Sequence, residues 1–218
     1  MAYGVPMLES SDLMAAGSIK GSGFESVAAD VVRLLEEGRF SRADLSRLLP
    51  PGDLSFLDCT VMPSLWYPLD TYGRLLDLLV REEGGGDPDY VVRRGRRAAE
   101  RLYKAGLYRQ LDATLDNGGE AFGPLMESLG LAMFEGTHWT VTHAGESANE
   151  GSFHIEVLVP EDFPECARWS SQGFIEYLGS RAQGGEAAVS CTSSRPEAMR
   201  MLFDTAPIGV LAPAGRRE

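Results

Sequence analysis

The chain has 218 residues, and its 20 lysines and arginines against 32 aspartates and glutamates give a formal net charge of −12 at pH 7. A composition that is 44% hydrophobic and 24% charged is typical of a globular protein with a buried core. The acidic balance argues against nucleic acid as a general partner, because phosphate backbones are bound by a positive footprint. No apolar run approaches the roughly 20 residues of a membrane span. The sequence therefore predicts neither a nucleic-acid partner nor a membrane span.

The N-terminus and the cysteines favour a cytoplasmic location. Residues 1–18 carry Glu9 and Asp12 without a basic start, which is unlike a signal peptide. The chain has three cysteines, an odd number that is too small for a disulfide framework. We expect residues 1–18 to be a loose leader and the Pro/Gly-rich residues 206–218 a flexible tail. Residues 19–205 are then expected to form a single domain.

The first part of the chain has the periodicity of helices. Apolar residues at helical spacing predict helices over 24–37 and 64–82, and Ser41 can cap a short helix at 42–49. After the Gly-rich break at 84–88, further helices are expected over 88–106 and 119–129. The small residues Gly95 and Ala98 indicate that the 88–106 helix closely approaches another helix.

After residue 133 the pattern changes to the alternation typical of strands. Residues 133–143 and 153–159 predict a hairpin, 163–181 a helix, and 186–192 with 198–204 a second hairpin. The predicted fold class is therefore α+β, with a helical N-terminal layer packed on a small antiparallel sheet and a hairpin–helix–hairpin C-terminal half.

The histidines and cysteines form an incomplete metal set. Strand parity places His143 and His154 on opposite faces of the first hairpin, and His138 with His154 would supply only two zinc ligands. Cys166 and Cys191 are the better pair, although buried free cysteines most often serve as small hydrophobes. We predict no metal and no cofactor, and leave open whether this cysteine pair contributes to a metal or redox site.

The sequence contains no catalytic signature. GxSxG, CxxC and HExxH are absent, and the glycines at 84–86 lack the lysine and the preceding strand of a phosphate loop. The helices at 24–37 and 42–49 mix acids with arginines, so they present no basic face for DNA. We therefore expect no enzymatic activity, and the alternative is an enzyme of unknown reaction that uses a pocket between helices and sheet.

One candidate binding surface is basic. Arg93, Arg97 and Arg101 step by four residues and align on one face of the 88–106 helix. Such a face is either solvated and paired with acids elsewhere in the fold, or it binds a protein partner or an anionic ligand.

A second candidate site is aromatic. A helical layer on a twisted sheet can enclose an apolar cavity, and aromatic side chains are suited to line it. The four residues predicted to bind a small apolar ligand there are Trp66, Trp139, Phe174 and Tyr177. The alternative is that they are ordinary core residues.

Several segments resemble an uncharacterised bacterial family known mainly from myxobacteria. They read IKGSGF at 19–24, VMPSLWYPLDTYGRLLDLL at 61–79 and YVVRRGRRAAERLYKAGLY at 90–108, and the resemblance spans about residues 17–205. At fold level the pattern is similar to the superfamily of TRAPP vesicle-tethering subunits, heme–nitric-oxide-binding domains and 4-vinyl-reductase-type sensor domains. That resemblance implies a helical layer on an antiparallel sheet, and in several members dimerisation or an apolar ligand cavity.

The chain departs from both metal-binding branches of that superfamily. The sensor domains hold zinc with three cysteines and a carboxylate, whereas here only Cys166, Cys191 and Glu186 correspond, and methionines occupy the remaining region. The heme-binding branch needs a proximal helical histidine and Tyr-x-Ser-x-Arg, whereas residues 177–181 read Tyr-Leu-Gly-Ser-Arg. The resemblance therefore implies neither zinc nor heme for this chain.

Together these observations favour a non-enzymatic cytoplasmic module of bacterial signalling. It would sense a small apolar ligand, or act as a scaffold through a homodimer or a protein partner. The charge is segregated, since residues 93–109 hold seven basic residues against one acid, and residues 135–187 hold nine acids against two arginines. Such segregation allows complementary docking, either within the fold or between subunits.

Overall fold

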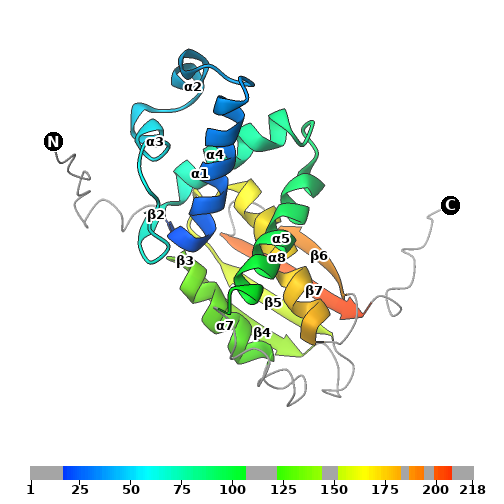
Figure 1. Ribbon diagram of the computed structural model, residues 1–218. Coiled ribbons are helices and arrows are strands. Elements are labelled where there is room, and N and C mark those ends of the chain that lie inside the picture. The colour runs from blue at the N-terminus through cyan, green and yellow to red at the C-terminus, as the bar shows by residue number, and fades with distance from the viewer. Residues whose placement is uncertain (1–16, 107–121, 144–151, 183–186, 194–198, 208–218) are drawn as a thin grey trace.

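The computed structural model describes residues 17–106, 122–143, 152–182, 187–193 and 199–207 (Figure 1). Its helices are α1 (Gly21–Glu36), α2 (Arg42–Leu48), α3 (Pro51–Ser55), α4 (Leu69–Glu82), α5 (Pro88–Lys104), α7 (Phe122–Met133) and α8 (Glu165–Ala182). Its strands are β1 (Ser18–Lys20), β2 (Trp66–Pro68), β3 (Phe134–Glu135), β4 (His138–His143), β5 (Phe153–Leu158), β6 (Ala187–Ser193) and β7 (Arg200–Pro207). This arrangement of helices and antiparallel strands confirms the predicted α+β class.

The structure describes only part of the two terminal segments expected from the sequence. Residues 1–16 of the expected leader and residues 208–218 of the expected tail lie outside the described part. Ser18 already pairs in β1 and is fully buried, and β7 extends to Pro207. The domain limits expected from sequence remain a prediction.

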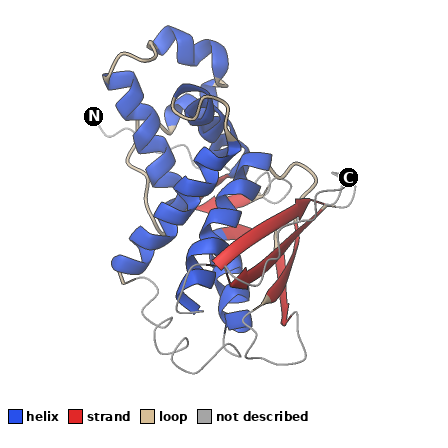
Figure 2. Ribbon diagram, turned by 90° about the vertical axis from the view of Figure 1, so that its right-hand side faces the viewer, coloured by secondary structure: helices blue, strands red, loops and turns tan. Residues whose placement is uncertain are grey.

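The four-stranded sheet forms one layer, and the long helices lie on one side of it (Figure 2). Its order is β4-β5-β7-β6, with every neighbouring pair antiparallel. The register pairs Trp139 with Val157 and Val141 with Ile155, so these side chains share the face that the helices cover. The register pairs His143 with Phe153 and His154 with Thr142, so the two histidines occupy positions of opposite parity. The prediction from strand parity is confirmed.

A second, three-stranded sheet was not predicted. β1 lies between β2 and β3, pairing Ile19 with Tyr67 and with Phe134. The predicted helix start at residue 64 is therefore wrong, because residues 66–68 form a strand and α4 begins only at Leu69. The cause is non-local, since the strand exists by pairing with β1, and the backbone N–H of Gly21 also donates to the Leu65 carbonyl at 2.8 Å.

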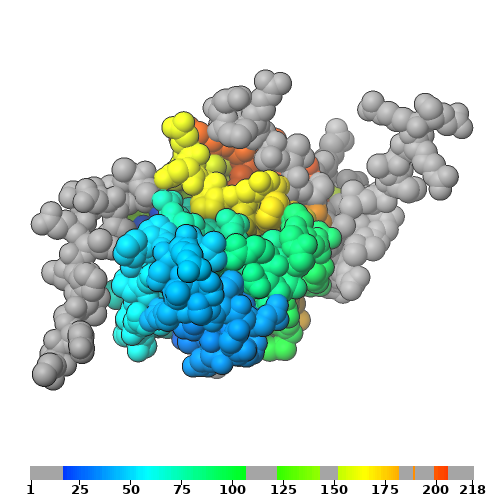
Figure 3. Space-filling view, turned by 90° about the horizontal axis from the view of Figure 1, so that it is seen from above, coloured from blue at the N-terminus to red at the C-terminus, as the bar shows by residue number. Residues whose placement is uncertain are grey.

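Local capping explains where the N-terminal helices begin. Ser41 and Asp44 form a reciprocal capping box at the start of α2. This confirms the predicted role of Ser41 as the N-terminal cap. The Pro50–Pro51 pair ends α2 and also starts the short α3, because proline is favoured in the first turn of a helix. Asp87 caps α5 by accepting from the backbone N–H of Asp89. Seen from above, these N-terminal helices lie beside the green surface of α5 (Figure 3).

Helices α5 and α8 cross with their backbones in contact. A Cβ added to Gly173 would stand 1.8 Å from the Val92 carbonyl oxygen, and one added to Gly95 would stand 2.1 Å from the Ser170 carbonyl oxygen. Only glycine at both positions allows this approach. The close contact expected from Gly95 is confirmed, and α8 is the helix it contacts.

We predict that Gly173→Ala and Gly95→Ala each lower the free energy of unfolding by about 1–3 kcal/mol or more, because the new methyl group must push two helix backbones apart. Urea denaturation measures this. Gly52→Ala in α3 is the control, since a Cβ there meets nothing within 4 Å and should leave stability unchanged or slightly raised. If Gly173→Ala unfolded with the same free energy as the wild type, the backbone contact between α5 and α8 would be contradicted.

Candidate functional site

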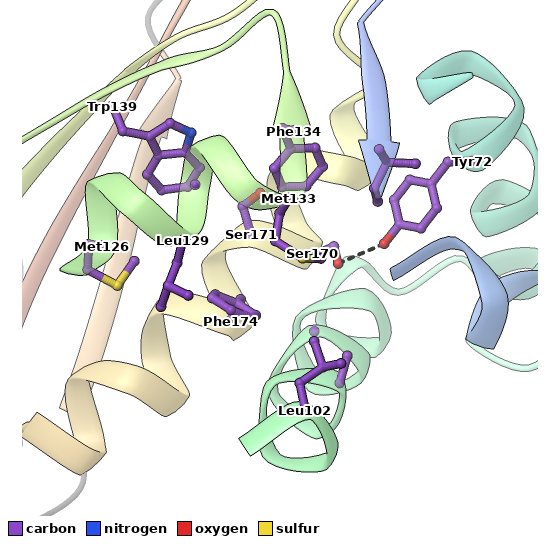
Figure 4. A pocket seen from close by; sticks show the side chains of 14 residues that line it. Tyr72, Leu102, Met126, Leu129, Met133, Phe134, Trp139, Ser170, Ser171 and Phe174 are labelled. Carbon is purple, nitrogen blue, oxygen red and sulfur yellow. Dashed lines mark hydrogen bonds between the residues drawn. The ribbon is translucent and has the colours of Figure 1, made fainter. Parts of the chain in front are cut away.

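A small apolar cavity lies between α5, α7 and α8, beside the inner face of the sheet (Figure 4). Its volume is about 30 Å³, which is room for two or three water-sized groups. The lining side chains are almost all apolar, and they come from seven elements. They are Ile19, Tyr72, Gly95, Ala98, Leu102, Met126, Leu129, Gly130, Met133, Phe134, Trp139, Ser170, Ser171 and Phe174.

The indole of Trp139 forms one wall of the cavity and lies directly on α7. A Cβ added to Gly130 would be 2.3 Å from the indole ring atoms, so the ring packs against the helix backbone. The indole Nε1 donates to Thr137 Oγ1 at 3.0 Å, and that hydroxyl donates to the Phe134 carbonyl at 3.0 Å. This buried chain of hydrogen bonds fixes the orientation of the ring.

Two further hydrogen bonds connect the walls of the cavity. The backbone N–H of Val141 donates to Glu127 Oε1 at 3.0 Å, which ties α7 to the edge strand β4. At the other end, the hydroxyls of Tyr72 and Ser170 are 3.0 Å apart and join α4 to α8. Burial raises the pKa of Tyr72 to about 12, so the phenol is protonated at neutral pH.

The polar groups of the lining are engaged with the protein itself. Ser171 Oγ donates to the Ala167 carbonyl at 2.9 Å, and Tyr72 and Ser170 bond to each other. A polar ligand would lose its bonds to water here and find few partners in return. The arrangement therefore favours an apolar occupant.

The structure brings together two of the four predicted aromatic residues. Trp139 from β4 and Phe174 from α8 both line the cavity. Trp66 is not in the lining, and its ring lies 4.2 Å from Lys20 Nζ. Tyr177 is also outside the lining, with its ring 6.1 Å from that of Tyr103.

Sequence reasoning missed most of the aliphatic lining. Met126 and Leu129 lie on the buried stripe of α7, and Leu102 lies on α5. Their spacing is that of any core-facing helix residue, so periodicity alone cannot separate the lining of a cavity from ordinary core. The one local signal is Gly130, which leaves space beside its helix for the indole.

The predicted arginine surface is divided in the structure. Arg97 and Arg101 line a second, polar cavity of about 410 Å³, together with Arg33 and Arg94. Arg93 lies outside it and pairs with Asp87 at 3.4 Å. Arg33 and Arg94 were not predicted, because their places depend on contacts between α1, α4 and α5 rather than on helical spacing.

Cys166 is a core residue. Its Sγ donates to the Gly73 carbonyl at 3.4 Å, and burial together with the adjacent Asp77 raises the pKa of the thiol well above its ordinary value. The side chain of Cys191 lies outside the described residues, so a role for the pair stays open. Within the described ranges, no three His, Cys, Asp or Glu side chains are grouped closely enough to hold a metal ion.

The fold is similar to that of solved H-NOX domains. A mutant of H-NOX from T. tengcongensis aligns with a TM-score of 0.56 and 13% identity, over 86% of this chain and 97% of that one. A structure solved to study heme redox potential and porphyrin distortion aligns with a TM-score of 0.54 and 13% identity, over 86% and 99%. Another, on heme distortion in the H-NOX family, gives 0.51 and 11% over 89% and 98%.

These likenesses show the fold alone. No protein-family model and no curated protein sequence matches this chain. The class that the coordinates define is thus an α+β domain with the H-NOX arrangement of helices and sheet. In the part of the chain that is described, no helix is both long and apolar enough to cross a membrane.

Heme, which two of those structures concern, does not fit the residues of this chain. The sequence has three histidines, all on β4 and β5, and His154 Nδ1 is 2.8 Å from Asp204 on the outer face of the sheet. The cavity volume of about 30 Å³ is far below the roughly 300–1,000 Å³ of cofactor pockets. Cys166, another residue type that can ligate heme iron, is not among the lining residues.

The buried phenol of Tyr72 gives a pH-dependent prediction. Tyr72→Phe should lower the free energy of unfolding by about 1 kcal/mol at pH 8, because Ser170 loses its partner. The folded-state pKa of about 12 lies above the ordinary value of 10.0, so this group stabilises the wild type fully below pH 10 and less as pH rises towards 12. The phenol's contribution falls by about 1.4 kcal/mol by pH 11.

Urea midpoints of both proteins between pH 8 and 11 measure the effect. The variant has no phenol to ionise at this position, so the gap between the two proteins should close near pH 11. A gap that stays constant would mean that Tyr72 ionises like an exposed tyrosine.

Proposed function

We propose that this chain is a non-enzymatic sensor module that binds a small apolar molecule, without heme, in the cavity between α5, α7 and α8. The observation that carries the proposal is the apolar cavity itself, whose polar wall groups already bond to one another. Its volume suits a molecule of two or three heavy atoms, and a larger one requires the walls to move. The H-NOX-like fold supports a sensory role in bacterial signalling, and we place the module in the cytoplasm.

Ligand binding can be transmitted to the rest of the domain because the wall of the cavity also connects α7 to the sheet. The Trp139 indole rests on Gly130 of α7 and is held by Thr137. A ligand too large for the cavity displaces either this ring or α7, and α7 is bonded to β4 through Glu127. A ligand shifts the balance between two such arrangements only by binding one of them better. The signal would then be a movement of α7 relative to the sheet.

The titratable groups near the apolar cavity support the non-enzymatic proposal. Burial raises the pKa of the Asp77 carboxyl, and Cys166 lies beside it, but neither residue lines the apolar cavity. Among the described lining residues the one titratable side chain is Tyr72, whose hydroxyl bonds to Ser170 and whose raised pKa keeps it protonated, so no base faces a substrate there. The alternative is an enzyme of unknown reaction, and screening a broad set of substrates for turnover tests it.

The scaffold form of the hypothesis concerns assembly rather than ligand binding. A homodimer or a complex with a protein partner stays a prediction from the sequence. Analytical ultracentrifugation at increasing protein concentration tests it, and a protein that remains monomeric throughout would contradict the homodimer.

Xenon is a suitable probe for the apolar cavity, because it binds dry apolar space without hydrogen bonds. We predict that xenon pressure shifts the NMR signals of the Trp139 indole N–H and the Leu129 methyl groups in the wild-type protein. Signals of residues distant from the cavity, such as Leu48 on α2, should not move.

A matched pair of variants sharpens this test. Leu129→Ala should lower the free energy of unfolding by about 2–5 kcal/mol and enlarge the cavity, so that benzene raises the melting temperature of the variant. Leu131→Ala is the control, since Leu131 lies on the same helix with 53% of its surface exposed. Absence of xenon shifts in the wild type, together with equal responses of the two variants to benzene, would refute the proposal.

A further inference from the structure

We propose that the polar cavity between α1 and α5 binds a small phosphorylated anion through Arg97 and Arg101. This site does not depend on the function proposed above. Its volume of about 410 Å³ falls within the range of small-molecule sites. From above, the blue surface of α1 and the green surface of α5 lie next to each other (Figure 3). The cavity lies between residues of these two helices and of the end of α4.

The inner wall of this cavity is a fixed network of ion pairs. Arg94 Nη1 lies 2.6 Å from Asp30 Oδ2, and the arginine side chain is only 13% exposed. Arg33 Nη2 lies 2.7 Å from Glu83 Oε1, and the Tyr90 hydroxyl donates to the other oxygen of Glu83. These contacts join α1, the end of α4 and α5, so the wall is preorganised.

The network leaves the cavity with an excess of positive charge. Arg33 and Arg94 are balanced by the two carboxylates that line the cavity. Arg97 and Arg101, one helical turn apart and exposed, have no hydrogen-bond or ion-pair partner among the described residues. Two like charges at this spacing repel each other, and a bound anion would relieve the repulsion.

Phosphate chemistry matches this arrangement best. A guanidinium presents paired N–H donors that fit phosphate oxygens, and two guanidiniums one turn apart can bind one diphosphate group together. The concave site reduces solvent screening of both charges. A long nucleic acid is disfavoured, because the chain as a whole carries a charge of −12. A small soluble phosphorylated molecule is therefore the occupant that we assign.

The test is calorimetric titration of the full chain with inorganic pyrophosphate at low ionic strength. Arg97→Gln/Arg101→Gln should weaken binding at least about tenfold, because both charge-assisted contacts are lost. The control is Arg93→Gln/Arg47→Gln, which removes the same charge from arginines outside the cavity, paired with Asp87 and Asp44. This control should keep the affinity within about twofold of wild type.

Two further arms distinguish phosphate recognition from general attraction. Arg97→Lys/Arg101→Lys keeps both charges but lacks the guanidinium geometry, so its affinity should fall between those of the wild type and the glutamine variant. Citrate should bind more weakly than pyrophosphate. The proposal is overturned if wild type does not bind pyrophosphate, if both glutamine double variants lose affinity equally, or if citrate binds as tightly. Urea midpoints verify that all variants fold.

Discussion

The backbone contact between α5 and α8 is the constraint on which the apolar cavity depends. Gly173 lies against the Val92 carbonyl and Gly95 against the Ser170 carbonyl, so no side chain separates the helices at their crossing. Side chains must diverge on either side of such a crossing, and Leu102 and Phe174 border the space that remains. The apolar cavity is small because the crossing is close.

The same helix, α5, forms a wall of both cavities. Gly95, Ala98 and Leu102 face the apolar cavity, and the residue before each of the last two, Arg97 and Arg101, lines the polar one. Consecutive residues differ by about 100° around a helix, so these are neighbouring faces of one rod. Because α5 is in backbone contact with α8, a displacement of α5 either moves that helix as well or separates the two backbones. An occupant of either cavity that displaced α5 would therefore change the shape of the other cavity. Such a shared element is a physical requirement for coupling between two sites.

An element could be predicted from sequence when the residues that cause it are neighbours along the chain. The long helices and both hairpins were predictable, because their burial follows the periods of 3.6 and 2 residues. The strands at 18–20 and 66–68 were not, since three residues carry no period and their pairing joins distant segments. For this reason the start of α4 was misplaced. The strand predicted over 133–143 is divided in the structure, because residues 134–135 pair with β1 rather than with β5.

The same reasoning separates the candidate residues. Trp139 and Phe174 were found because strand parity and a helical stripe both turn them towards the helix–sheet interface. Arg97 and Arg101 were found by their spacing, whereas Arg94 joins the site through Asp30 on another helix. Spacing of four residues also selected Arg93, which pairs with Asp87 instead. Ion pairs between residues distant in the sequence do not appear in the helical periodicity. The sequence could therefore define a basic face of α5 but not the polar cavity beside it.

An aromatic side chain takes up the space beside α7. The indole of Trp139 occupies it, and this position requires both a glycine at 130, where any Cβ would collide with the ring, and the hydroxyl of Thr137 to hold the indole N–H. These two requirements reinforce each other, because the ring cannot rotate away without leaving a buried N–H unpaired. Two small residues and one aromatic residue therefore fix how much of the apolar cavity stays empty. What remains is a small apolar cavity bordered by α7, which is bonded to the edge strand β4 through Glu127.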